Sequence, residues 1–197
     1  MAKRLFDVLA AGVGLLLLAP LLAAIALWVR LDSPGPVFFR QQRVGRHGVP
    51  FRIHKFRTMA HAPVAAGPLL TVGADARVTR AGRFLRRTKL DELPQLVDVL
   101  QGTMSLVGPR PEVPRYVALY PPELRAVVLS VRPGITDPAS LLFRDEGEVL
   151  GRAADPEREY VEVVLPAKLR CSARYVERMS LAEDLRLNGR TLRALLR

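Results

Sequence analysis

The segment VLAAGVGLLLLAPLLAAIALWV, residues 8–29, contains no charged side chain, and it determines how the rest of the chain is placed. Its 22 residues reach the roughly 20 that a helix needs to cross a bilayer. A cleaved signal peptide has a shorter apolar core that ends at a small-residue cleavage site. A soluble helix of this length keeps a polar face. We therefore predict a membrane segment, while a full span and a buried core helix stay open as alternatives.

Pro20 and the flanking charges favour a segment that enters and leaves the membrane on the same side. A proline inside a helix removes a backbone hydrogen bond and bends the helix. Lys3 and Arg4 precede the apolar run and Arg30 follows it, and positive charge marks the cytoplasmic end of a membrane segment. Each arm would be about 12 residues, or roughly 18 Å, which is too short to cross. The prediction is a re-entrant hairpin over residues 1–31 that bends at Pro20.

The whole chain of 197 residues has a net charge of +11, which indicates an anionic partner. Aromatic residues make up only 6% of the sequence, whereas proteins that bind single-stranded nucleic acid stack its bases on aromatic side chains. We therefore expect membrane lipids and phosphorylated substrates as partners, and no nucleic acid. Cys171 is the one cysteine in the sequence, which excludes an internal disulfide.

Residues 32–197 are predicted to form one compact cytosolic domain of the α+β class that is mostly α-helical. Two short runs of aromatic and β-branched residues, 37–39 and 51–56, flank a turn that contains glycine and proline. This pattern predicts a small antiparallel β-sheet directly after the membrane segment. Residues 60–80 are small and mixed in character and are predicted to be a loop.

The rest of the domain carries the periodicity of helices. Leucines and valines at helical spacing predict an amphipathic helix over residues 91–100, and Gly102 ends it. Further helices are expected at residues 115–130 and 155–180. The tail, residues 184–197, places leucines beside arginines and therefore predicts an amphipathic helix at the membrane interface.

Two adjacent carboxylates, Asp91 and Glu92, follow a segment rich in arginine and lysine. Basic side chains and the start of a helix together form a phosphate site. A carboxylate in such a site can share a Mg²⁺ ion with the phosphate, or it can attack the phosphorus itself. The arginines are expected to keep Asp91 ionised. Acidic residues at an ordinary solvated helix start are common, so the pair alone leaves that alternative open.

Four motifs follow the proline-containing apolar segment in a fixed order: KFRTM (55–59), LDELPQ (90–95), SLVGPRP (105–111) and RPGIT (132–136). With them, the chain resembles the bacterial sugar transferases of the polyprenyl-phosphate type, the monotopic phosphoglycosyltransferases. The resemblance runs from residue 4 to about residue 187, and the length is similar to that of minimal members with a single catalytic domain.

The resemblance implies a membrane enzyme that moves a sugar-1-phosphate from a UDP-sugar to undecaprenyl phosphate and requires Mg²⁺. In such enzymes the aspartate of an Asp-Glu pair attacks the phosphate next to the sugar and expels UMP. The lipid phosphate then takes over the sugar phosphate, which starts a lipid-linked glycan such as an exopolysaccharide or another glycoconjugate. Asp91 matches the nucleophile, and Glu92 matches its partner in metal binding or proton transfer. The implied location is the cytoplasmic face of a bacterial inner membrane.

Six basic residues also match family positions. Those that the resemblance implies near the phosphates are Arg86, Arg110 and Arg144, and those in matching motifs with less defined roles in substrate binding are Lys55, Arg57 and Arg132. The chain departs from the family pattern at two places. Ala19 stands where many members have serine before the proline of the bend, and Asp137 follows RPGIT where many have glycine. The second departure means that a sugar preference does not carry over.

Two other functions stay open on the residues alone. One is a membrane-tethered basic protein that binds nucleic acid or acidic lipid without catalysis, which gives the acidic pair no role. The other is a metal-dependent hydrolase of a lipid phosphate, which would use the same carboxylates with water as the acceptor. The sequence identifies neither the sugar nor the glycan pathway, and a homodimer is compatible with it.

Overall fold

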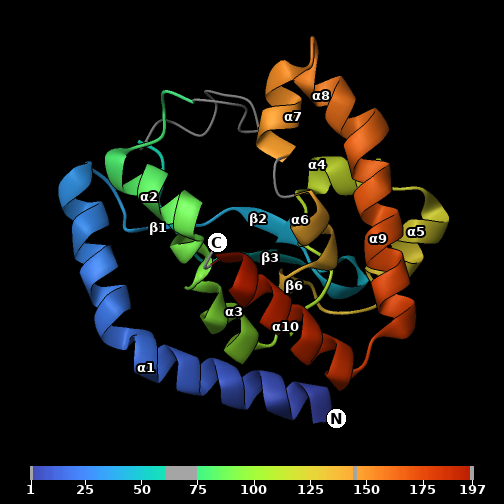
Figure 1. Cartoon of the computed structure of the whole chain (residues 1–197), viewed down its shortest axis with the longest axis horizontal. Helices are drawn as coiled ribbons and strands as arrows, with labels where there is room; N and C mark the ends of the chain where they lie inside the picture. The colour runs from blue at the N-terminus through green and yellow to red at the C-terminus, as the bar shows by residue number, and fades with distance from the viewer. Residues whose placement is uncertain (1, 61–74, 144–145, 196–197) are drawn as a thin grey trace.

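The computed structural model describes residues 2–60, 75–143 and 146–195. Its first element is the helix α1, Ala2–Asp32, which contains Pro20 and changes direction part-way along its length (Figure 1). Among the described residues, α1 is the one helix that is long and apolar enough to cross a membrane. Much of its apolar surface is exposed, at Leu5, Leu9, Val13, Leu16, Leu17, Leu27 and Leu31. The apolar run is therefore not a buried core helix.

The first turns of α1 are fixed to the rest of the protein by polar contacts. Lys3 donates to the carbonyl of Val107 at 3.1 Å and forms an ion pair with Asp184. The buried carboxylate of Asp7 accepts a hydrogen bond from the Ser105 hydroxyl at 2.7 Å. These contacts join the start of α1 to a strand and to the last helix.

The last turn of α1 contacts the same folded body. Arg57 donates to the carbonyls of Val29 at 3.2 Å and Ser33 at 2.8 Å. The Asp32 carboxylate accepts from the backbone N–H of Ala81 at 3.0 Å. Both ends of α1 therefore lie against one domain, with the bend between them (Figure 1).

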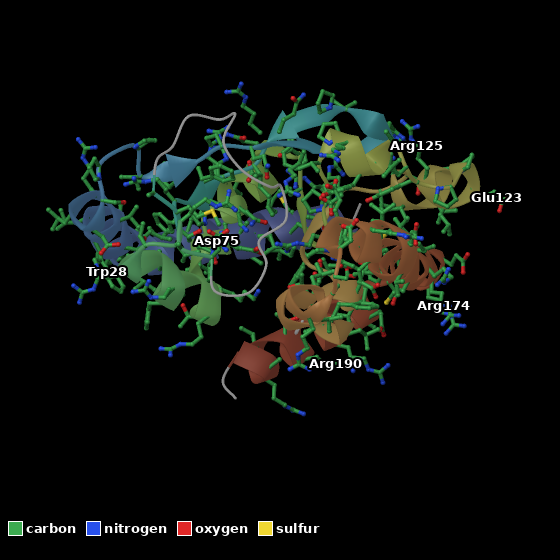
Figure 2. All side chains as sticks on the ribbon, turned by 90° about the horizontal axis from the view of Figure 1, so that it is seen from above. Trp28, Asp75, Glu123, Arg125, Arg174 and Arg190 are labelled. Carbon is green, nitrogen blue, oxygen red and sulfur yellow. The ribbon has the colours of Figure 1, made fainter. Side chains whose placement is uncertain are left out.

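Trp28 lies near the end of α1 and packs on Phe84, with the two ring centroids 5.5 Å apart. Phe84 belongs to the helix α2, Arg80–Thr88. Figure 2 shows Trp28 at one end of the molecule and Glu123 and Arg125 at the opposite end. The second arm of α1 thus runs beside α2, at one edge of the fold.

The predicted antiparallel sheet is present as two short two-stranded pieces. The strand β1, Phe38–Phe39, pairs with β4, Lys55–Phe56. Between them β2, Gln42–Val44, pairs with β3, Pro50–Arg52. Both pairs are antiparallel, so the predicted hairpin is confirmed, and a 3-10 turn, Arg46–Gly48, closes its inner end. Most of the predicted loop 60–80 falls on residues 61–74, which lie outside the described residues.

The predicted helix over residues 91–100 begins later than expected. After α2, Lys89 takes a left-handed conformation with a φ of 58° and starts a single 3-10 turn, Leu90–Glu92. The helix α3 covers only Gln95–Gln101 and ends at Gly102, which has a φ of 86°. The acidic pair is therefore in a tight corner between two helices, and not in the first turn of one.

A parallel strand pair was not predicted from the sequence. The strand β5, Ser105–Val107, lies beside β6, Gly134–Thr136. Glycine and proline follow or precede both strands closely, and these residues are typical of turns and loops. A Cβ atom on Gly134 would lie 2.0 Å from the backbone nitrogen of Gly108, so this pairing requires glycine. The pair brings the motifs SLVGPRP and RPGIT side by side.

Helices form the remaining layer. The expected helix over 115–130 is interrupted by Pro121 and Pro122, because neither proline can continue a helix with its backbone N–H. It divides into α4, Pro114–Val117, and α5, Pro122–Val128. Two short helices follow, α6, Pro138–Leu142, and α7, Glu146–Arg152.

The predicted helical region 155–180 is confirmed. It consists of α8, Pro156–Glu159, a π-helical turn, Tyr160–Val164, and α9, Leu165–Arg178. The last helix, α10, covers Leu181–Leu195. The protein is therefore mostly helical with small sheets, as predicted.

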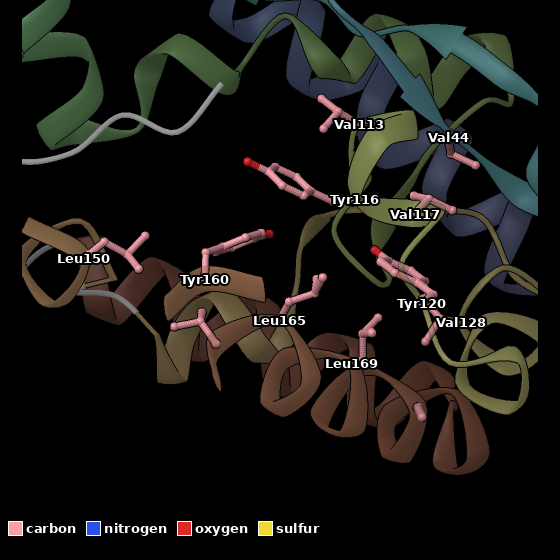
Figure 3. Close-up of a cluster of buried hydrophobic side chains, with 12 residues drawn as sticks. Val44, Val113, Tyr116, Val117, Tyr120, Val128, Leu150, Tyr160, Leu165 and Leu169 are labelled. Atoms are coloured by element: carbon pink, nitrogen blue, oxygen red, sulfur yellow. The ribbon is translucent and has the colours of Figure 1, made fainter. Parts of the chain in front are cut away.

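The main core lies where α9 packs on α5, and α4 and the π-helical turn contribute side chains to it (Figure 3). Tyr116 and Tyr160 belong to it, with ring centroids 4.9 Å apart. Leu165 and Leu169 of α9 are almost completely buried in the same cluster. This core packs the helices together next to the loop that follows β5, which carries Arg110.

Candidate active site

Asp91 and Glu92 are both buried in the 3-10 turn between α2 and α3. The ammonium group of Lys55, on β4, lies 2.8 Å from an oxygen of Glu92 and 3.6 Å from an oxygen of Asp91. The strand that carries the KFRTM motif thus delivers a cation directly to the acidic pair.

Arg110 reaches the same pair from the loop after β5. Its two terminal nitrogens donate to the two oxygens of Glu92, at 2.6 and 3.2 Å. This two-pronged geometry is the strong form of an arginine–carboxylate contact. Three motifs that are far apart in the sequence therefore meet at Glu92, and the structure brings together Lys55, Asp91, Glu92 and Arg110.

The two carboxylates have opposite pKa shifts although they are neighbours. Burial alone would raise the pKa of Glu92, but Arg110 and Lys55 hold it well below its usual value. Burial raises the pKa of Asp91, and the negative charge of Glu92 adds to this, against the opposing effect of Lys55. The basic residues therefore lower the pKa of Asp91 less than burial raises it. That Asp91 is ionised at neutral pH stays a prediction.

Asp91 also keeps a free oxygen. Its Oδ1 atom is buried and has no hydrogen-bond partner among the described residues. A buried polar atom without a hydrogen bond destabilises the fold unless a ligand or a cation pairs with it. By contrast, both oxygens of Glu92 accept hydrogen bonds from Arg110. Asp91 is thus the member of the pair that is available to a substrate or a cation.

The residues fit a Mg²⁺ ion only in part. In the described part of the chain no three His, Cys, Asp or Glu side chains gather as a ready metal cage. Mg²⁺ is commonly held by one or two carboxylates together with substrate phosphates and water. The unpartnered oxygen of Asp91 suits that arrangement, whereas Glu92 is already engaged by two cations.

Arg86 approaches the site from α2. Its Nε donates to the hydroxyl of Thr58 at 2.8 Å, and its positive charge acts on Asp91. Burial lowers the pKa of Arg86. Gly82 sets this position, since a Cβ atom there would lie 1.9 Å from the carbonyl oxygen of Thr58. Thus α2 lies directly against the segment after β4, where Thr58 accepts the hydrogen bond from Arg86.

Replacing Gly82 with alanine is expected to move α2 away from Thr58 and to displace Arg86. Overpacking a tight contact costs roughly 1–3 kcal/mol, so the unfolding midpoint in denaturant should fall clearly. The control is Gly189→Ala on α10, where an added Cβ meets no atom within 4 Å. Equal stability of the two variants would contradict the proposed contact.

Two predicted site residues lie elsewhere, and one is not described. Arg57 donates to carbonyls at the end of α1, and Arg132 donates from its Nε to the carbonyl of Gly102 at 2.7 Å. Neither has a contact with Asp91 or Glu92 among the described interactions. Arg144 lies outside the described residues.

Residues 1–197 match the family model described as bacterial sugar transferase. The chain belongs to the bacterial sugar transferase family.

Individual relatives of this bacterial sugar transferase differ in the sugar that their names state. A UDP-N-acetylgalactosamine-undecaprenyl-phosphate N-acetylgalactosaminephosphotransferase of Aeromonas hydrophila is 38% identical over 98% of the chain. A UDP-glucose:undecaprenyl-phosphate glucose-1-phosphate transferase of Caulobacter vibrioides is 39% identical, also over 98%. The chain spans 43% of the Aeromonas protein and 69% of the Caulobacter protein.

The name of a third relative refers to exopolysaccharide production. An exopolysaccharide production protein, PSS, of Rhizobium leguminosarum bv. phaseoli is 50% identical over 55% of the chain and 54% of its own length. The names of the three relatives state different sugars or none. Similarity to them therefore does not determine which sugar this bacterial sugar transferase uses.

The structure adds residues to the site of this bacterial sugar transferase that the sequence reasoning missed. Arg43 donates to the carbonyl of Pro111 at 3.2 Å and to Glu112 at 3.1 Å. The hydroxyl of Tyr160 donates to the other oxygen of Glu112 at 2.7 Å. This network fixes the loop that carries Arg110. No local pattern could reveal it, because its members come from a strand, a loop and a π-helical turn.

Proposed function

We propose that this chain transfers a sugar-1-phosphate from a UDP-sugar to undecaprenyl phosphate through a covalent intermediate on Asp91. The observation that carries the proposal is the buried, unpartnered oxygen of Asp91 beside a carboxylate that Arg110 and Lys55 already neutralise. Neighbouring carboxylates whose pKa values are pushed apart usually divide two roles between them. The names of the Aeromonas and Caulobacter relatives support the substrate classes.

In the proposed first step, the Asp91 carboxylate attacks the phosphorus that bears the sugar. A bond forms between Oδ1 and this phosphorus, and the phosphorus–oxygen bond to the UMP portion breaks, so UMP leaves with the bond electrons. Burial removes water from the nucleophile and strengthens the electrostatic interactions around it. The positive charges of Lys55 and Arg86 offset the negative charge of the reacting phosphates.

In the proposed second step, a phosphate oxygen of undecaprenyl phosphate attacks the same phosphorus. The bond to Asp91 breaks, its carboxylate is restored, and the sugar diphosphate lipid is released. Glu92 does not react in this scheme, since it holds Lys55 and Arg110 in position. When bound, Mg²⁺ would neutralise phosphate charge, and Asp91 would hold it through Oδ2, the oxygen that does not attack phosphorus.

We also propose that α1 is re-entrant and that the catalytic domain rests on the cytoplasmic face of a bacterial inner membrane. Both ends of α1 make polar contacts with one folded body, at Lys3 and Asp7 on one side and at Asp32 on the other. A straight span would place these ends on opposite sides of the bilayer. A membrane-fixed site next to the headgroups would let a soluble donor and a lipid acceptor meet.

Cysteine labelling tests this topology. In a Cys171→Ser background, single cysteines at Ala2 and at Arg40 are expected to react with a membrane-impermeant maleimide only in inside-out vesicles, because both lie on the cytoplasmic face. A cysteine at Leu17, exposed on the apolar surface of α1, should stay unlabelled. Labelling of the two flanking positions from opposite sides would instead establish a full span.

The function itself is tested by UMP release from a panel of UDP-sugars in Mg²⁺-containing detergent buffer. The proposal predicts sustained release only when undecaprenyl phosphate is supplied, with formation of a sugar diphosphate lipid. A hydrolase would release inorganic phosphate from the lipid with no sugar donor present. Anionic lipid binding that persists in Asp91→Asn, with no turnover of any donor by the unchanged chain, would favour a tethering protein.

A further inference from the structure

A second basic site lies apart from Asp91, at the start of α1. A cavity of about 220 Å³ opens between the first turn of α1, the 3-10 turn after β2 and the segment before β6. Its basic lining consists of Lys3, Arg4, Arg46 and Arg132. None of these four has a contact with Asp91 or Glu92 among the interactions of the described residues.

The three arginines are held in place but are not neutralised. Arg4 donates to the carbonyls of Val99 and Leu100, at 2.7 and 3.2 Å. Arg46 donates from its Nε to a backbone carbonyl at 2.9 Å, and Arg132 does so at 2.7 Å. Each contact orients a guanidinium group without cancelling its charge, and none of the three forms an ion pair within the described ranges.

The acidic residues nearby offset only part of this charge. Asp184 is engaged by Lys3. Asp7 lines the cavity and keeps its negative charge, since it accepts hydrogen bonds only from neutral donors, the Ser105 hydroxyl at 2.7 Å and a backbone N–H at 3.3 Å. Burial lowers the pKa of Arg132, and the positive charges of Arg4 and Arg46 lower it further, against the opposing effect of Asp7. The cavity thus gathers like charges, which an anion would relieve.

Capping of α3 explains only part of this arrangement. Arg4 and Arg132 donate to carbonyls at the end of α3, where positive side chains are favourable. Arg46 comes from a different element and contacts the carbonyl of Ser130, so it has no part in that cap. Its positive charge adds to those of Arg4 and Arg132 around the cavity.

The surroundings indicate which anion fits. The guanidinium group of arginine donates paired hydrogen bonds that match the oxygens of a phosphate group. The cavity adjoins exposed apolar surface, since Leu5 and Leu9 follow Arg4 on α1 and Met179 lines its rim before α10. We propose that this cavity binds the phosphate of an anionic phospholipid headgroup, with the acyl chains along α1. The proposal uses the membrane placement of α1 proposed above, and it does not depend on chemistry at Asp91.

The test uses the full chain in a nonionic detergent and the variant Arg46→Gln. Arg46 is exposed and makes one described hydrogen bond, so the variant should fold, which its unfolding temperature without ligand verifies. The matched control is Arg40→Gln, because Arg40 is also exposed and donates to one backbone carbonyl, at 3.1 Å. Apparent affinities are read from the rise in unfolding temperature with dihexanoylphosphatidylglycerol, dihexanoylphosphatidylcholine or inorganic phosphate.

The unchanged chain and Arg40→Gln should bind the phosphatidylglycerol most tightly, and Arg46→Gln should bind it roughly tenfold more weakly, as expected for the loss of one charge-assisted contact. Equal affinity of Arg46→Gln and the unchanged chain would overturn the site. Equal affinity for inorganic phosphate and phosphatidylglycerol would overturn the lipid assignment. Formation of the sugar-phosphate adduct on Asp91 should persist in Arg46→Gln, which separates this proposal from the proposed function.

Discussion

Replacing Asp91 with asparagine is expected to reduce turnover by at least about 10⁴-fold, the scale seen when a covalent nucleophile is removed. The amide has nearly the shape of the carboxylate but cannot attack phosphorus. The measurement is the rate of UMP release with a UDP-sugar and undecaprenyl phosphate. The same variant should form no covalent sugar-phosphate adduct.

The Asp91→Asn variant should also be no less stable than the unchanged chain. Burial raises the pKa of Asp91 above its unfolded-state value, so folding favours the protonated form, and the ionised group destabilises the fold as pH rises through the folded-state pKa. The neutral amide removes that penalty, while Lys55 keeps its contact with Glu92. Chemical unfolding at neutral pH, with a chelator present, measures the difference.

A matched change controls for the substitution itself. Asp155 caps the exposed start of α8 through hydrogen bonds to two backbone N–H groups, and asparagine serves as well there. The Asp155→Asn variant should keep both turnover and stability. If Asp91→Asn lost its activity together with several kcal/mol of stability, the loss would reflect misfolding, and the assignment of Asp91 as nucleophile would be contradicted.

Replacing Glu92 with glutamine should have the opposite effect on stability. The half-buried Arg110 and Lys55 would be left without their buried counter-charge, and breaking this partly solvent-screened ion pair costs up to about 3 kcal/mol. Turnover should fall as well, because the loop of Arg110 and the strand of Lys55 both meet at this carboxylate. Chemical unfolding and UMP release on the same preparation measure the two effects.

The stabilising effect of Glu92 should depend on pH. Its folded-state pKa lies well below the ordinary 4.5, so its contribution is fully present above about pH 4.5 and is lost as pH falls through the lowered pKa. The stability gap between the unchanged chain and Glu92→Gln should therefore be constant near neutrality and narrow in acid. Glu162→Gln, which breaks an exposed pair with Arg158, should cost less than about 1 kcal/mol. A similar cost for both variants would contradict the role of Glu92.

Sequence patterns predicted the elements whose signals are local. The uncharged run around Pro20 indicated one long apolar helix, and aromatic runs on either side of a glycine-rich turn indicated an antiparallel hairpin. The acidic pair was marked as a site by its setting among motifs. Of the basic residues assigned to that site, Lys55 and Arg110 do contact Glu92.

Local sequence patterns did not predict which segments pair across long distances in the chain. The parallel strands β5 and β6 are three residues long and are bounded by glycine and proline, so periodicity could not reveal them. The contacts that each arginine side chain makes also depend on its neighbours in the tertiary structure. Arg57 stands two residues from Lys55, and strand alternation alone would place both side chains on one face. The strand β4 ends at Phe56, however, and Arg57 binds the end of α1 instead. The raised pKa of Asp91 likewise follows from burial, which charge patterns do not show.

The most direct measurement of the central claim is intact-protein mass spectrometry of the purified chain with Mg²⁺ and single UDP-sugars, without any lipid acceptor. A mass increase of one sugar phosphate is expected with at least one donor. This adduct should be absent in Asp91→Asn, and it should disappear when undecaprenyl phosphate is added. Release of UMP that requires the lipid acceptor, with no adduct for any donor, would contradict the covalent intermediate and indicate direct transfer between the two substrates.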